Sequence, residues 1–373
     1  MKKILILIML ASVALSCRFE CSATGEQKVE SYGQNLEDEL FSLIDDDTLD
    51  ALESFGMDSL NISGIYDISI KSITNFFSES LLSGVKSALK NFFVLLSLII
   101  ILVCISALAG SSKYSDCISL AAVCVVTLNA AKSLNPIIST VASSMHVTAQ
   151  FMKGYIPVYA GIIAFSGNPA SALTYNSLLF GLSEMISAFS NYLCVDIIGM
   201  FFCLSIAFSI SENVNGNRFI GGVNRVMGIV LGLISTLFTG LLSIRSVLAS
   251  SLDSVSQKGA RFLMSSLIPI VGGAMSEAYS SILGSINLIK GSVAVIGIAV
   301  VAVLNIPVIL EALIYYASFN ALSIAAEVLD SQKVSLLFRS FASGIRFLLL
   351  LSVFEMFVLI ISTGIMLSLK GGS

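Results

Sequence analysis

Residues 262–297 read FLMSSLIPIVGGAMSEAYSSILGSINLIKGSVAVIG. This apolar stretch contains a proline, a glycine pair, a carboxylate at Glu277 and an amine at Lys290. A charged side chain at bilayer depth costs roughly 2.5–3.5 kcal/mol on insertion scales, so such residues usually face other helices or water rather than lipid. The stretch therefore predicts a membrane protein with an interior that is shielded from lipid.

The composition of the whole chain points the same way. Of 373 residues, 56% are apolar and only 12% are charged, and the mean hydropathy is +0.93. These values are far from those of a soluble domain, so we predict an all-α, polytopic helical membrane protein. Residues 24–90 carry thirteen acids and four bases, whereas residues 91–373 carry ten acids and thirteen bases. An acidic region is repelled by anionic lipid, and the sequence has no basic surface for nucleic acid, so its expected partner is protein.

Three regions are expected along the chain. Lys2 and Lys3 precede a twelve-residue apolar run and then small residues, which predicts a signal peptide over residues 1–23. An uncleaved anchor is the alternative, but the run is shorter than the roughly 20 residues that span a membrane. Residues 24–90 are then an acidic extracytoplasmic helical region, and residues 91–373 are a polytopic transmembrane domain.

Seven apolar runs are firm candidates for membrane spans, and nine is the maximum. The runs cover residues 92–109, 117–131, 154–166, 172–190, 192–210, 226–244, 263–283, 291–318 and 347–369. Two of them, 154–166 and 263–283, contain or adjoin Gly, Pro and Ser breakers. These two are therefore candidates for re-entrant segments rather than crossings.

Two proline-containing segments resemble each other. Ile156-Pro157 leads to Gly161, and Ile268-Pro269 leads to Gly273. Paired Gly/Pro-interrupted segments in two halves indicate a transport site at a repeat interface, although Gly and Pro are also common in ordinary membrane helices. The breaks expected in the apolar region are Pro157, Gly161, Gly167, Pro169, Pro269, Gly272, Gly273 and Pro307.

The residues needed for several kinds of catalysis are missing. His146 is the one histidine in the chain, so neither an HExxH zinc helix nor a Ser-His-Asp triad can be built. No GxxxxGK[ST] phosphate loop occurs either, so a Walker-type ATP site is excluded. We predict no enzymatic activity and no cofactor or metal.

Isolated ionisable residues remain within or beside the apolar runs. They are Glu184, Asp196, Glu277, Lys290, Glu311 and Glu355. Glu355 is the most informative, because at least eight apolar or small residues flank it on each side. Such residues line a hydrated path, pair with other helices of the chain or contact a partner subunit, and the sequence leaves these three roles open.

The order of these features resembles the stage III sporulation protein AE family of endospore-forming bacteria. The resemblance covers essentially the whole chain and is carried by four kinds of feature. They are the signal peptide, the acidic region, the block Pro157-Val158 to Ser166–Ser171, and the 262–312 region with Lys290-Gly291 and Ile306-Pro307, followed by Tyr315-Tyr316 and Ala325-Ala326-Glu327.

The resemblance implies a role that the composition does not. Members of the family are polytopic subunits of the AA-to-AH sporulation complex, encoded in the mother cell and located in the outer forespore membrane. With a forespore partner, that complex is thought to form a channel or feeding apparatus, and a separate ATPase would supply energy. A self-sufficient, ion-coupled secondary transporter that uses the intramembrane carboxylates is the alternative, and a passive scaffold without a pore is a third hypothesis.

Overall fold

The computed structural model describes residues 70–109, 115–188, 196, 198–210, 216–267 and 272–368. The expected signal peptide, most of the acidic region and Pro269 lie outside the described residues. The described elements are seven helices: α5 (Ile70–Ala109), α6 (Ser115–Phe165), α7 (Pro169–Ala188), α8 (Ile198–Ile210), α9 (Gly216–Leu267), α10 (Gly272–Val328) and α11 (Gln332–Ser368). The predicted all-α class is therefore confirmed for this part of the chain.

Four of the helices are long and apolar enough to cross a membrane, judged by length and composition. The apolar parts are Ala88–Ile105 of α5, Arg218–Gly259 of α9, Glu277–Val328 of α10 and Gln332–Leu367 of α11. α8 is apolar over Ile198–Ser209 but shorter. The membrane character of the chain therefore rests on these helices, while the count of seven to nine crossings stays a prediction.

Several expected breaks do not interrupt helices. Pro157 and Gly161 lie inside α6, so the runs 117–131 and 154–166 belong to one helix of 51 residues. Pro307 likewise lies inside α10. A proline removes one backbone hydrogen bond, but packed neighbouring helices and local adjustments let membrane helices continue through it. Helix α5 also runs across residue 90, the expected boundary of the transmembrane domain.

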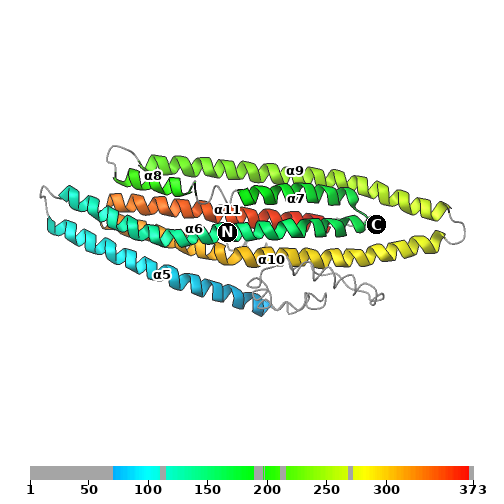
Figure 1. Ribbon diagram of the computed structural model, residues 1–373, viewed down its shortest axis with the longest axis horizontal. Helices are drawn as coiled ribbons and strands as arrows, with labels where there is room; N and C mark the ends of the chain where they lie inside the picture. Colours follow the sequence, from blue (N-terminus) through cyan, green and yellow to red (C-terminus); the bar gives the residue numbers. More distant parts are fainter. Residues whose placement is uncertain are drawn as a thin grey trace. The chain divides into compact units, whose positions relative to one another are not determined.

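Helix α11 occupies the centre of the packing. It contacts α6, α7, α8, α9 and α10, and its most extensive partner is α10. Figure 1 shows α10 and α11 side by side, joined at one end by a short turn. The Ser323 hydroxyl of α10 donates to the Ser335 carbonyl of α11 at 3.1 Å, which holds the two helices in antiparallel register near this turn.

A cluster of buried tyrosines joins α6 to its neighbours. Tyr155 and Tyr159 stack with ring centroids 5.5 Å apart, and Tyr159 meets Tyr175 of α7 edge-on at 5.2 Å. The Tyr155 hydroxyl donates to the Val293 carbonyl of α10 at 3.1 Å. All three side chains are fully buried, and buried aromatic hydroxyls of this kind usually need such partners.

A glycine permits the close approach of α6 and α10. A Cβ built on Gly297 would collide with the ring and hydroxyl of Tyr155. We expect Gly297→Ala to lower the free energy of unfolding by about 1–3 kcal/mol, because the added methyl group forces the fully buried Tyr155 ring or the α10 backbone to move. Thermal unfolding of the purified protein in detergent measures the effect.

Gly232→Ala is the matched control, because a Cβ there meets nothing within 4 Å. If the two alanine variants melt at the same temperature as the parent protein, the close contact between Tyr155 and Gly297 is wrong.

Candidate functional site

A cavity lies between α6, α7, α9 and α11. Its volume is about 190 Å³, and its lining residues are Met145, Met185, Ile186, Val226, Met227, Val230, Leu231, Ile234, Phe347, Leu351, Phe354 and Glu355. On α11 the lining positions recur three, four and seven residues apart, which places them on one helical face. The walls are therefore apolar except for a single carboxyl group.

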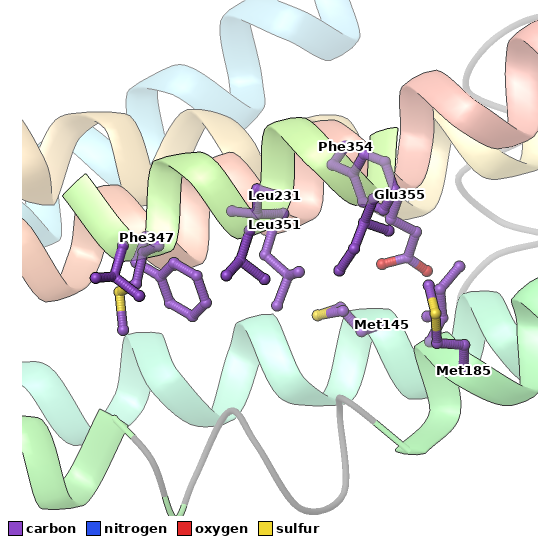
Figure 2. A pocket seen from close by; sticks show the side chains of 12 residues that line it. Met145, Met185, Leu231, Phe347, Leu351, Phe354 and Glu355 are labelled. Carbon is purple, nitrogen blue, oxygen red and sulfur yellow. The ribbon is translucent and has the colours of Figure 1, made fainter. Parts of the chain in front are cut away.

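That carboxyl group belongs to Glu355. Figure 2 shows it extending from α11 towards Met145 and Met185. Its side chain is 0% exposed, and neither oxygen has a hydrogen-bond partner among the described residues. The Ser352 hydroxyl, one turn earlier on the same helix, is also buried without a partner in this part of the chain.

An unpartnered buried carboxyl group is unusual, because most buried polar side chains are hydrogen-bonded. A carboxylate that loses its hydration without gaining a partner costs several kcal/mol. Glu355 is therefore suited to receive a hydrogen-bond donor or a cation that enters the cavity. Among the described residues, no group of three His, Cys, Asp or Glu side chains is placed to hold a metal ion.

A second polar constellation closes the turn between α6 and α7. Gly167 has a φ of 86°, a backbone conformation that glycine adopts readily, and Pro169 is the first residue of α7. Asp253 of α9 accepts the backbone N–H groups of Ala170 and Ser171 at 2.8 and 2.9 Å. It thus supplies, from another helix, the acceptors that the start of α7 needs.

Gln257 lies one turn after Asp253 on α9 and contacts the same turn. Its side-chain amide donates to the Gly167 carbonyl at 2.6 Å and to Asn168 Oδ1 at 3.3 Å. Both Asp253 and Gln257 are at most 3% exposed. Sequence reasoning identified the turn but missed these two residues. The available signal was a carboxylate and an amide four residues apart, with Asp253 as the single acidic residue of the α9 sequence.

The comparisons with known proteins agree on one family. The profile described as Stage III sporulation protein AE (spore_III_AE) matches residues 55–369. The chain belongs to this family. The Stage III sporulation protein AE of Bacillus subtilis (strain 168) is 20% identical over 176 residues, which are 47% of this chain and 44% of that protein. The chain thus aligns with less than half of that relative, and no solved structure matches it.

The six ionisable residues expected to be functional all fall within the part matched to the stage III sporulation protein AE family. The structure does not gather them at one place. Glu355 lines the cavity, and Lys290 is 3% exposed within α10. Glu184 is exposed and pairs with Lys153 at 3.0 Å. The others do not line the cavity: Asp196 and Glu277 are exposed, and Glu311 is half-buried.

Proposed function

We propose that this chain is a non-enzymatic integral membrane subunit of a channel or feeding complex between mother cell and forespore, needed for forespore development after engulfment. The observation that carries the proposal is the family match over residues 55–369. Four helices of membrane-spanning length and composition support a place within the bilayer.

The proposal places the chain in the outer forespore membrane, with its N-terminal region outside the mother-cell cytoplasm. The acidic composition of residues 24–90 favours contact with other subunits rather than with anionic lipid. A separate ATPase subunit would supply the energy, in agreement with the missing phosphate loop of this chain. A forespore-side protein would complete the passage between the two compartments.

Deletion of the gene tests this proposal. Sporulation should stop after engulfment while vegetative growth stays normal, and a copy of the gene expressed in the mother cell should restore spore formation. A deletion strain that forms spores at the parental frequency would refute the proposal.

Glu355 favours a second candidate function, an ion-coupled secondary transporter that works without partners. A buried carboxyl group that faces a cavity within the apolar helices is suited to bind a coupling ion. The purified protein alone in liposomes should then take up solute under an ion gradient, and Glu355→Gln should abolish uptake. No uptake under any ion gradient would count against this function.

A further inference from the structure

Three helices carry the same arrangement of charge: two charged residues bound an uncharged segment of membrane length. The segments are residues 133–152 of α6, 226–244 of α9 and 291–310 of α10. Twenty helical residues are about 30 Å long, which is the thickness of the hydrocarbon layer. The bounding residues are Lys132 and Lys153, Arg225 and Arg245, and Lys290 and Glu311.

The bounding residues of α6 and α10 lie at matching levels. Two hydrogen bonds set the antiparallel register of these helices: from Ser144 Oγ to the Leu304 carbonyl, 2.9 Å, and from Tyr155 Oη to the Val293 carbonyl, 3.1 Å. The two bonded residues are eleven positions apart on each helix, and the residue numbers rise along α6 in the direction in which they fall along α10. The same register places Lys132 at the level of Tyr316.

Three further hydrogen bonds show which residues of α5, α9 and α11 lie at the level of Tyr315 and Tyr316 on α10. They run from Asn91 Nδ2 to Tyr315 Oη, 3.2 Å, from Asn224 Nδ2 to Ser343 Oγ, 3.1 Å, and from Ser323 Oγ to the Ser335 carbonyl, 3.1 Å. The last bond places Ser323 of α10 beside Ser335 of α11. Tyr315, eight residues earlier on α10, is therefore level with Ser343, eight residues later on the antiparallel α11. Lys90 and Arg225 adjoin the bonded asparagines, and Arg346 lies about 4.5 Å along α11 from Ser343.

Four cations from four helices thus share one level, and we call Lys90, Lys132, Arg225 and Arg346 the basic belt. All four are exposed. The acid of α10 nearest to this level is Glu311, four residues from Tyr315 and half-buried. The belt therefore carries a net positive charge that is open to the surroundings.

Apolar side chains beside the belt indicate what surrounds it. Leu128 is 66% exposed one turn before Lys132, and Val226 and Ile229 are 60% and 61% exposed next to Arg225. A soluble polyanion would leave these side chains in water. Lipid covers them with acyl chains while its phosphates meet the cations.

We propose that the basic belt binds the headgroups of anionic phospholipids in one leaflet. This binding depends on membrane embedding and not on the role in sporulation.

Lipid selectivity tests the belt. The full-length protein is reconstituted with spin-labelled phosphatidylglycerol or phosphatidylcholine, and the lipid fraction immobilised on the protein is measured. The double variant Lys132→Gln/Arg225→Gln should lower the preference for phosphatidylglycerol at least fivefold, because each basic residue near an anionic leaflet contributes about a factor of five. High salt should weaken the preference of the parent protein.

The matched control is Lys258→Gln, which removes an exposed cation that lies about 50 Å along α9 from Arg225. This control should keep the preference of the parent protein. Equal losses in the double variant and in Lys258→Gln, or no preference for phosphatidylglycerol in the parent, would overturn the proposal.

A depth measurement tests whether the belt marks one edge of the hydrocarbon layer. The chain has no tryptophan, so single-tryptophan variants give an unmixed fluorescence signal. Leu237 and Ile101 are 64% and 53% exposed and lie on opposite sides of the belt. Lipids brominated near mid-chain should quench one of the two variants, Leu237→Trp or Ile101→Trp, strongly and the other weakly. Equal quenching of the two variants would mean that the belt does not lie at an edge of the hydrocarbon layer and would overturn the proposal.

Discussion

Replacing Glu355 by methionine is expected to raise the stability of the protein and to abolish spore formation. Both carboxyl oxygens of Glu355 are buried without a partner among the described residues. Removing an unsatisfied buried group should therefore add about 1–3 kcal/mol to the free energy of unfolding. Methionine has a similar length and already lines the cavity at Met145 and Met185. Thermal unfolding in detergent and spore counts measure the two effects.

The two measurements separate the possible roles of Glu355. Glu184→Gln is the control, because Glu184 is exposed and its ion pair with Lys153 is worth at most about 1 kcal/mol. It should change neither stability nor sporulation. A Glu355→Met protein that is less stable than the parent would mean that the carboxyl group stabilises the fold. A more stable protein with normal sporulation would exclude a functional role.

Replacing Asp253 by alanine is expected to loosen the turn between α6 and α7. The change removes the acceptors of two backbone N–H groups, which Asp253 holds at 2.8 and 2.9 Å in a buried position. Hydrogen bonds to charged groups are worth about 1.5–3 kcal/mol each, so the loss of both should reach about 3–6 kcal/mol. Thermal unfolding of the full-length protein in detergent is the measurement.

Two further variants show whether the turn itself is responsible. Asp253→Asn keeps one side-chain oxygen and should lose about half as much stability. Ser254→Ala is the neighbouring control, because the Ser254 hydroxyl donates to the Ser250 carbonyl of its own helix. If Ser254→Ala costs as much as Asp253→Ala, the long-range cap is not the cause.

The Gly167 side of the turn allows an independent check. Gly167→Ala should also destabilise, because φ is 86° and a Cβ would lie 3.0 Å from Gln257 Nε2. Adding Gln257→Ala removes the contact but not the backbone strain. The double variant should therefore lose less than the sum of the two single variants, and strict additivity would contradict the contact.

Some features of the site could be predicted because they are local. The Ser166–Ser171 segment combines a glycine with a proline, and helix α6 does end at Phe165 before α7 begins at Pro169. Glu355 stands out because one carboxylate interrupts a long apolar run. Asp253 has no such local signal, since the backbone groups that it caps are 82 and 83 residues away in sequence.

The continuity of the helices could not be predicted in the same way. Pro157 and Pro307 have the same local chemistry as Pro169, yet the first two lie inside helices and the third begins one. A proline can be accommodated where neighbouring helices support the backbone around it. Whether such neighbours exist is a property of the packing and not of the dipeptide.

By itself, the sequence determined that this is a helical membrane protein of the sporulation family with charges enclosed in its apolar part. Hydropathy and charge spacing are summed along the chain, so they need no contacts between helices. Only the tertiary structure decided that Glu355 faces an apolar cavity, that Asp253 caps a distant helix and that four cations share one level. Each of these depends on the register of packed helices, which is set by side-chain contacts between residues far apart in sequence.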